Sequence, residues 1–243
     1  RGELGVSYTY SVPVAELLHE RLFITIPLAL LAMGLSVVIA FSLGIYAASH
    51  HNQRGDVLIM GISQLGISIP NFWLALLLIL LFAVNAGWFA SGGFPGWDAG
   101  LWPALKALML PALALATVQG AILARFTRSA VLETLREDYV RTARAKGLNQ
   151  RQTLWRHVLR NAMIPIVTVM GLQFANLLAG TIVVESVFSL PGIGRLILQS
   201  ISNRDVVVVR DVVTLLVAMV VVINFIVDIL YAVIDPRLRA RDV

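Results

Sequence analysis

The chain has 243 residues, of which 58% are hydrophobic and 14% charged, and its mean hydropathy is +0.82. A soluble domain carries about 25% charged residues, so this composition excludes an ordinary soluble domain and indicates a membrane protein. The net charge of +5 does not indicate nucleic-acid binding, because the basic residues cluster where a membrane protein places them. The chain has no cysteine, which excludes disulfides and thiolate metal sites.

The predicted elements begin with a charged lead-in over residues 1–21 and continue as five apolar runs, of which the first four contain no Asp, Glu, Lys or Arg and the fifth contains only Asp228. A membrane-spanning helix needs about 20 apolar residues, so each run is long enough to span. The second run contains Pro70, where we expect a kink within one span. The sequence therefore predicts an all-α polytopic helical membrane protein with a single transmembrane domain over residues 22–243. The five predicted spans cover residues 22–48, 57–87, 107–124, 162–184 and 212–234.

The distribution of basic residues predicts the orientation of the spans. Segment 125–160 holds nine Arg and Lys residues against three acidic ones, and the C-terminal tail adds three arginines. Because loops rich in Lys and Arg stay in the cytoplasm, this segment and the tail are expected there. The lead-in and residues 88–106 and 185–211 then lie on the opposite, extracytoplasmic side. The chain as given is expected to run N-out and C-in, which fits a missing upstream span.

Residues 137–160 read EDYVRTARAKGLNQRQTLWRHVLR, a basic stretch in an oily chain. Gly147 suits the end of one helix, because glycine accepts the left-handed conformation, and Asn149 can cap the next helix. We therefore expect two short helices with a bend at Gly147–Leu148. A loop that only sets topology needs charge alone, whereas small residues let another backbone approach closely. The pattern favours a docking helix, with small Ala143 and Ala145 and an apolar stripe of Leu154, Trp155, Val158 and Leu159.

Residues 185–204 read ESVFSLPGIGRLILQSISNR, and Pro191-Gly192 signals a turn. The apolar residues after the turn fall on one helical face, which suits a short helix on the outer surface of the membrane. Such a helix either contacts an extracytoplasmic protein or caps a pathway, or it only packs on the surface; the sequence leaves both open. The apolar face consists of Ile193, Leu196, Ile197 and Ile201.

Polar residues inside the predicted spans are functional candidates. Gln119, Gln173 and Asn176 can line a polar pathway or form hydrogen bonds between helices, and the second interpretation is favoured because such bonds are common. Asp228 is the only acid inside a predicted span, and it lies close enough to the cytoplasmic end to reach the interface. The adjacent pair His50–His51 does not share a helical face and has no third ligand nearby. We expect a solvated loop there and no metal site.

Several stretches resemble one protein family. TARAKGL followed by RHVLRNAMIP resembles the cytoplasmic coupling loop of ABC importer permeases, and most closely that of the dipeptide, oligopeptide and nickel permease family. The general Glu-Ala-Ala-x-x-x-Gly pattern is matched only at Ala143 and Gly147, which favours the peptide branch over sugar-type permeases. GELGVSYTYSVPVAELLHERL resembles the lead-in of the first ("B-type") permease of a pair. SIPNFWLALLLILLF, VFSLPGIGRL and VDILYAVIDPRLR resemble later parts of the family. Its first span has no counterpart, so we expect an N-terminally truncated chain and six spans at full length.

The resemblance implies the ABC type I importer permease fold and a permease subunit of an ATP-driven importer, with di- or oligopeptides as the expected substrate. In such systems the coupling loop, here within residues 125–160, docks into a groove of an ATPase. The implied partners are a second permease, two ABC ATPases, an extracytoplasmic solute-binding protein and membrane lipid, without nucleic acid. The implied ATPase contacts are Tyr139, Ala143, Ala145, Lys146, Gly147 and Leu148. The extracytoplasmic loop carries Phe188, Pro191, Gly192 and Gly194.

The sequence contains no GxxxxGK[ST] phosphate loop, so we expect a non-catalytic subunit that binds no cofactor, with ATP and Mg on the partner ATPases. The expected location is the bacterial cytoplasmic (inner) membrane. One alternative is an ATP-independent channel or ion-coupled secondary transporter, which typically carries titratable residues deep in its spans. A purely structural membrane subunit, or an ABC importer of nickel, glutathione or opines, would also be compatible with the sequence.

Overall fold

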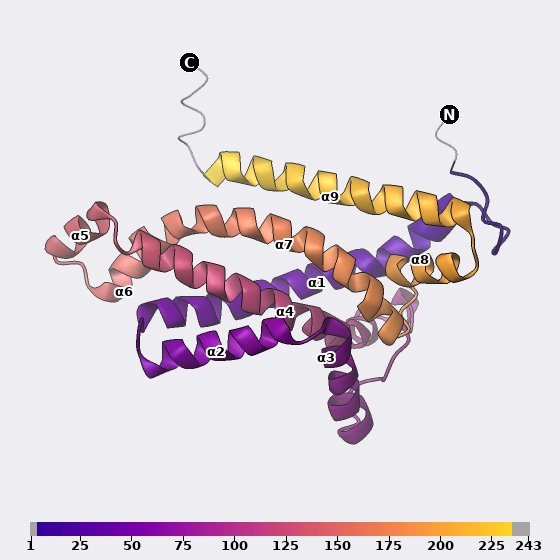
Figure 1. The fold of residues 1–243 in the computed structure, drawn as a ribbon, viewed down its shortest axis with the longest axis horizontal. Helices are drawn as coiled ribbons and strands as arrows, with labels where there is room; N and C mark the ends of the chain where they lie inside the picture. Colours follow the sequence, from indigo (N-terminus) through magenta and orange to yellow (C-terminus); the bar gives the residue numbers. More distant parts are fainter. Residues whose placement is uncertain (1–3, 235–243) are drawn as a thin grey trace, which may run out of the picture.

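The computed structural model describes residues 4–234 and shows an almost entirely helical chain (Figure 1). The two longest helices in the described chain are α1 (Val14–Ser49) and α4 (Leu101–Thr134). The others are α2 (Arg54–Ser68), α3 (Asn71–Leu78), α5 (Asp138–Ala145), α6 (Gln150–Thr153), α7 (Leu159–Val187), α8 (Ile193–Ser202) and α9 (Val206–Ile234). π-helical turns continue α3 over Ile79–Asn85 and join α6 to α7 over Leu154–Val158, and a 3-10 turn covers Trp97–Ala99. The predicted all-α membrane fold is confirmed.

Five spans were predicted, and the described chain offers four plus one broken span. The helices α1, α4, the continuous α6–α7 unit and α9 are each long and apolar enough to cross a membrane. The fifth candidate is the pair α2 and α3, which is bent by 101°. The prediction of a kink was therefore too mild: α3 turns sharply from the direction of α2 in Figure 1, and it packs on α4 and α7. Pro70 lacks an N–H and disfavours a helical residue before it, and Ile69 is accordingly extended at φ −85° and ψ 124°.

The helices run beyond the predicted spans, and α9 for example begins at Val206 rather than at residue 212. Helix α1 begins at Val14 rather than at residue 22, so only the residues before it form a non-helical lead-in. Helix α4 extends in both directions beyond residues 107–124, and α7 continues to Val187 rather than ending at residue 184. The predicted spans stop at the nearest charged residue, whereas charged side chains can lie within a helix where solvent or a partner receives them.

The centre of the bundle is the contact between α1 and α4, which is built from small residues. A Cβ added to Gly44 would lie 2.7 Å from both the backbone oxygen of Ala124 and the side chain of Thr127. A Cβ added to Gly120 would lie 2.9 Å from Ile39. These glycines let the two helices approach closely, as small residues do between helices in membranes. Helix α7 packs on α4, and α9 packs on α7.

The two ends of the bundle differ, and we call them the loop end and the α8 end. At the α8 end, α8 buries Ile193, Leu196 and Ile197 against α1 and α9, whereas Ile201 is 55% exposed and lies off the predicted apolar face. At the loop end lie α5, α6 and the turn between α1 and α2 (Figure 1). The predicted basic tail with Arg237, Arg239 and Arg241 lies outside the described residues.

The non-helical lead-in is held at the α8 end by one buried carboxylate. Ser7 Oγ donates to Oδ2 of Asp205 at 2.5 Å, and the N–H of Thr9 donates to the same oxygen at 3.0 Å. Asp205 also receives the N–H of Val208 at 3.3 Å, in the first turn of α9. Because Asp205 is only 1% exposed, these bonds replace its hydration and fix the lead-in to the junction between α8 and α9.

Candidate functional site

The basic loop folds as two short helices joined at a glycine. Helix α5 ends in a Schellman motif, in which the N–H of Leu148 donates to the carbonyl of Ala143 (3.3 Å) and that of Gly147 to the carbonyl of Arg144 (2.9 Å). Gly147 has φ +90°, a region that glycine adopts readily. Asn149 then caps α6 through a reciprocal capping box. The two predicted helices and the bend between them are confirmed.

Helix α5 turns one side toward the bundle. Val140 is fully buried in an apolar cluster that includes Val131 of α4 and Val158 of the π-helical turns, and Ala143 is only 7% exposed. An isolated helix of eight residues is not stable in water, so the order of α5 depends on this packing. Ala143, one of the implied ATPase contacts, therefore lies on the covered side, where its small side chain brings α5 close to the bundle.

The other side of the loop is exposed. Ala145, Lys146 and Gly147 are exposed, and Leu148 is half-buried. Tyr139 is 40% exposed, and its hydroxyl accepts a hydrogen bond from Asn161 Nδ2 at 2.9 Å. The result is a small-residue, basic surface at the tip of the loop.

The predicted apolar stripe of the second helix is only partly correct. Val158 and Leu159 are buried and Leu154 is half-buried, but Trp155 is 60% exposed. The stripe assumed α-helical spacing, whereas Leu154–Val158 is π-helical, with hydrogen bonds from i to i+5 that change the angular spacing of the side chains. Trp155 therefore adds an exposed aromatic side chain beside the loop.

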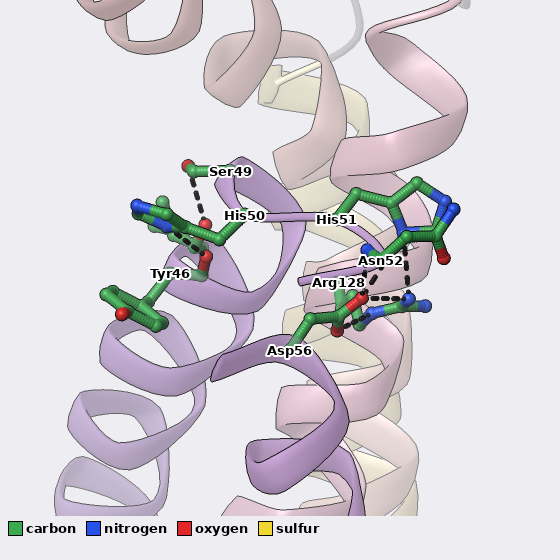
Figure 2. Close-up of polar contacts among 8 residues, drawn as sticks. Tyr46, Ser49, His50, His51, Asn52, Asp56 and Arg128 are labelled. Carbon is green, nitrogen blue, oxygen red and sulfur yellow. Dashed lines mark hydrogen bonds and ion pairs between the residues drawn. The ribbon is translucent and has the colours of Figure 1, made fainter. Parts of the chain in front are cut away.

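A buried ion pair fixes the base of the loop (Figure 2). Asp56, in the first turn of α2, is 2% exposed and accepts hydrogen bonds from Arg128 of α4, from Nε at 2.6 Å and from Nη2 at 2.7 Å. The N–H of Asn52 donates to the same carboxylate at 2.9 Å. Bidentate, charge-assisted bonds of this kind are among the stronger polar contacts. They join the α1–α2 turn to the part of α4 that leads into α5.

The adjacent histidines have different partners and point to opposite sides in Figure 2. The ring of His50 stacks on Tyr46 with centroids 4.4 Å apart, whereas His51 Nδ1 lies 3.3 Å from Asp56 Oδ2 and 3.0 Å from Arg128 Nη2. His51 is exposed, as expected of a solvated loop, and its ring also contacts the ion pair. Within the part of the chain that the structure describes, no three His, Cys, Asp or Glu residues are grouped to hold a metal ion.

The three polar residues predicted inside the spans are hydrogen-bonded in series. Gln173 Nε2 of α7 donates to Gln119 Oε1 of α4 at 2.8 Å, and Asn176 Nδ2 donates to Gln173 Oε1 at 3.0 Å. Gln119 and Gln173 are buried, which agrees with the favoured interpretation of bonds between helices, but Asn176 is exposed. Asp228 lies on an exposed side of α9.

The four residues predicted for the outer loop lie at the turn between α7 and α8. Phe188 is 1% exposed and belongs to the central core, and its carbonyl accepts the N–H of Gly93 at 2.8 Å. Gly192 and Gly194 are packed so closely that an added Cβ would overlap the carboxyl group of Glu185 or the backbone of Ile182. Together with half-buried Pro191, these positions shape a tight turn rather than an exposed contact surface.

Sequence reasoning missed Glu185, the fully buried acid within α7. It was assigned to a loop because the uncharged run before it ends at residue 184. Its carboxylate joins three helices through Thr25 of α1 and backbone groups of α8. The available signal in the sequence was the pair of glycines at 192 and 194, because closely spaced glycines indicate that another group packs against the backbone.

Comparison with known proteins connects this loop and bundle to one family. Residues 40–240 match the family described as "Binding-protein-dependent transport system inner membrane component". The chain belongs to this family. It is thus a multi-pass membrane permease of a binding-protein-dependent transport system.

Named relatives cover nearly the whole permease. It is 44% identical over 239 residues to a Brucella abortus protein named for a peptide transport system permease, a match that covers 98% of this chain and 76% of the relative. It is 40% identical to the dipeptide transport system permease protein DppB of Alkalihalophilus pseudofirmus (98% and 78%). It is 42% identical to the glutathione transport system permease protein GsiC of Escherichia coli (99% and 76%).

Solved structures support the fold of the permease. An inward-facing structure of the MetNI methionine ABC transporter matches with a TM-score of 0.76 at 19% identity, covering 90% of this chain and 97% of that chain. An amino acid ABC transporter matches with a TM-score of 0.66 at 17% identity, covering 89% and 94%. At these identities the likeness concerns the fold alone, and the predicted ABC importer permease fold is confirmed.

Proposed function

We propose that this permease is a non-catalytic subunit of an ATP-driven importer of di- or oligopeptides, and that two ATPase subunits drive it through the loop at residues 137–160. A second permease completes the translocation pathway, and a solute-binding protein delivers substrate at the α8 end. ATP and Mg are bound by the ATPases. The observation that carries the proposal is the ordered, exposed tip of the loop, anchored to the bundle by a buried face.

The packing of the loop supports its role in coupling. A force on the tip reaches α4 and α7 through the cluster around Val140, because α5 has no other buried apolar face in the described chain. The ion pair of Asp56 and Arg128 joins the α1–α2 turn to α4 beside this cluster. Displacement of the tip would therefore move several helices together. We assign Ala145, Lys146, Gly147 and Leu148 to the ATPase contact, with Tyr139 beside it, and Ala143 to the anchoring of α5.

An exposed strip along α7 carries polar side chains among apolar ones. Thr168 and Asn176 recur at helical spacing on this strip, together with apolar Leu172 and Val183. An exposed amide side chain is unfavourable against lipid, so Asn176 supports a polar pathway or a contact with the second permease on this side of the bundle. The break at Ile69–Pro70 lies in the neighbouring span and packs on α7 through α3. Interrupted helices at membrane depth are tolerated where they are buried or line a cavity.

The substrate is proposed from the relatives and from the chemistry of this strip. The relatives are named for peptide, dipeptide and glutathione transport. The exposed amide group of Asn176 can donate to and accept from peptide groups without selecting a side-chain charge. This chemistry favours peptides of varied sequence, so that the binding protein would supply most of the selectivity.

The orientation follows from the same proposal. If ATPases dock on the loop, the loop end is cytoplasmic and the α8 end is extracytoplasmic. Helix α1 then runs from the extracytoplasmic side toward the cytoplasm, in agreement with the excess of basic residues at the loop end. The proposed location is the bacterial cytoplasmic membrane.

The test is co-purification of the ATPases with Gly147→Asp and a matched control. Gly147 has φ +90° with nothing within 4 Å of an added Cβ, so the substitution meets no atom of this chain. Gly87 follows the π-helical turns that continue α3, has φ +66° and is equally open, so Gly87→Asp imposes a similar backbone strain of about 1–2 kcal/mol. We expect Gly147→Asp to reduce the amount of ATPase recovered at least about tenfold and Gly87→Asp to retain it, since a contact worth about 1.4 kcal/mol changes binding tenfold. Retention of the ATPases by Gly147→Asp, or equal loss in both variants, would refute docking at the tip.

A further inference from the structure

A buried carboxylate lies at the far end of α7 from the loop. Glu185 has 0% exposed surface and is placed two residues before the end of the helix. Its Oε1 accepts a hydrogen bond from Thr25 Oγ1 of α1 at 2.7 Å. Its Oε2 accepts the N–H of Gly194 at 2.7 Å and the N–H of Arg195 at 3.2 Å. One side chain of α7 therefore contacts both α1 and α8.

These bonds cap the first turn of α8 from outside its own segment. The first N–H groups of a helix have no partner within the helix, and the N-cap residue usually supplies one from its side chain. Here the N-cap is Gly192, which has no side chain, and Glu185 and Thr25 take its place. Thr25 Oγ1 accepts the N–H of Ile193 at 2.9 Å, so N–H groups of the first three residues of α8 are satisfied by α1 and α7.

The turn between α7 and α8 has been shaped around this carboxylate. An added Cβ on Gly192 would overlap the carboxyl group of Glu185, and one on Gly194 would overlap the backbone of Ile182. The N–H of Leu190 donates to the backbone carbonyl of Glu185 at 2.8 Å, which closes the turn. The first turn of α8 is thereby held at a fixed position against α7.

The same helix reaches the loop. Residues Gln150–Val187 form one continuous helical unit of 38 residues that begins at the cap of Asn149 and ends at the turn beside Glu185. Figure 1 places α6 at one extreme of the bundle and α8 at the other, with α7 between them. A displacement of this unit at the loop end can therefore reach the α8 end along one helix, whose irregular places are the π-helical turns at Leu154–Val158 and Pro165 in α7.

We propose that Glu185 is a positioning residue that makes α8 move together with α7, so that a displacement begun at the coupling loop reaches the outer helix. The inference rests on the proposed function, because it needs ATPases that act on the loop. Burial of Ile193, Leu196 and Ile197 holds α8 on α1 and α9, but apolar packing of this kind permits sliding. The hydrogen bonds of Glu185 are directional and fix the register of α8 relative to α7.

The experiment compares the positions of α7 and α8 in the complex with the second permease and both ATPases. This chain has no cysteine, so introduced cysteines are the only spin-label sites that it offers. Leu65→Cys on α2 is the common reference, paired with Val183→Cys on α7 or with Ser202→Cys on α8, all at exposed positions. Pulsed EPR gives each distance in nanodiscs, without nucleotide and after trapping with ATP and vanadate. The test is run with Glu185, Glu185→Gln and Glu185→Ala.

With Glu185, we expect both distances to change together on trapping. Glu185→Gln keeps the size and an acceptor oxygen for the N–H groups of α8, and we expect it to behave as the native chain does. In Glu185→Ala the α7 distance should still change, while the α8 distance stays constant or broadens. A purely structural role would lower thermal stability yet leave α8 following α7. If α8 follows α7 in Glu185→Ala as fully as in the native complex, the inference is overturned.

A second pair of variants tests the same inference if Glu185→Ala does not fold. Thr25→Val removes the hydroxyl that bridges Glu185 and Ile193 with little change in volume, and Thr25→Ser retains it. We expect Thr25→Val to uncouple α8 from α7 and Thr25→Ser not to, and equal behaviour of the two would overturn the inference. If the native complex does not retain ATPases, or shows no nucleotide-dependent change in either distance, the proposed function fails and the inference fails with it. Joint movement in every variant overturns the inference alone.

Discussion

The ion pair of Asp56 and Arg128 predicts that Arg128→Ala destabilises the permease, because the substitution would leave a buried carboxylate without its main partner. The Asp56 side chain is 3% exposed, and the substitution removes its two shortest hydrogen bonds, at 2.6 and 2.7 Å. The remaining contacts are the N–H of Asn52 at 2.9 Å and the ring of His51 at 3.3 Å. Neither supplies a permanent positive charge.

The expected loss of stability follows from the burial of both partners. Removal of one partner from a fully buried pair costs about 3–5 kcal/mol. Because the Arg128 side chain is 21% exposed, water can partly replace it, and we expect about 2–3 kcal/mol. For a chain of this size, such a loss lowers the Tm by about 4–12 °C. Arg128→Lys retains the charge but not the bidentate geometry, so we expect a loss of about 1 kcal/mol.

The assay is thermal unfolding of the purified permease in detergent, with Arg125→Ala as the matched control. Arg125 lies one turn earlier on α4 and donates to exposed Gln64 Oε1 at 3.1 Å, so its removal should change stability by less than about 0.5 kcal/mol. The double variant Asp56→Asn with Arg128→Met should lose less stability than the sum of the losses in Asp56→Asn and Arg128→Met alone, with a coupling free energy of about 1–3 kcal/mol. Equal effects of Arg125→Ala and Arg128→Ala, or additive effects in the double variant, would refute the reasoning.

Two further predictions concern packing and pH. Gly44→Ala should destabilise the permease by about 1–3 kcal/mol in thermal unfolding, because its Cβ meets α4. Gly34→Ala, with nothing within 4 Å of the added Cβ, should be neutral or stabilise by up to about 1 kcal/mol. Equal effects of the two substitutions would contradict the close contact of α1 and α4. Burial acts to raise the pKa of Asp205, but hydrogen bonds from Ser7, Thr9 and Val208 outweigh it and hold the pKa below its usual range. Since an unfolded aspartate has a pKa of about 3.9, this carboxylate stabilises the fold above that pH, and the contribution is lost as the pH falls through the lower folded value. Unfolding at about pH 6 and about pH 3 should therefore show a smaller acid-induced loss in Asp205→Asn than in the native chain, and an equal loss would contradict the assignment.

Local signals in the sequence were sufficient for the loop and for most of the spans. The bend at Gly147 and the cap at Asn149 depend on residues within a few positions of each other, so the sequence contains all the information that they need. The spans follow from the length of the apolar runs, which the bilayer requires of any crossing helix. The series of Gln119, Gln173 and Asn176 was partly predictable, because two of the three lie three residues apart on one helix.

Long-range contacts and irregular helix geometry could not be predicted in this way. Glu185 acquires its role only when Thr25, 160 residues earlier in the chain, is brought beside it. Its charge marked it as a loop residue, although it lies inside α7. Similarly, the π-helical turns at Leu154–Val158 have no residue pattern that distinguishes them from an α-helix, so Trp155 was placed on the wrong face. The 101° bend was underestimated because Pro70 predicts that a helix is interrupted but not by how much.

The anchoring of the loop has a consequence for the thermodynamics of association. Fixing the backbone of one residue costs about 1–2 kcal/mol in conformational entropy, so a loop that became ordered only on binding would lose much of its interaction energy. Here the Schellman motif at Gly147, the capping box at Asn149 and buried Val140 fix the backbone of the loop before any partner arrives. A subunit that binds the tip therefore meets a preorganised surface, and a small contact area suffices for a useful affinity. A smaller residue in place of Val140 would weaken this packing and raise the entropy cost of association, although no residue at the contact itself would change.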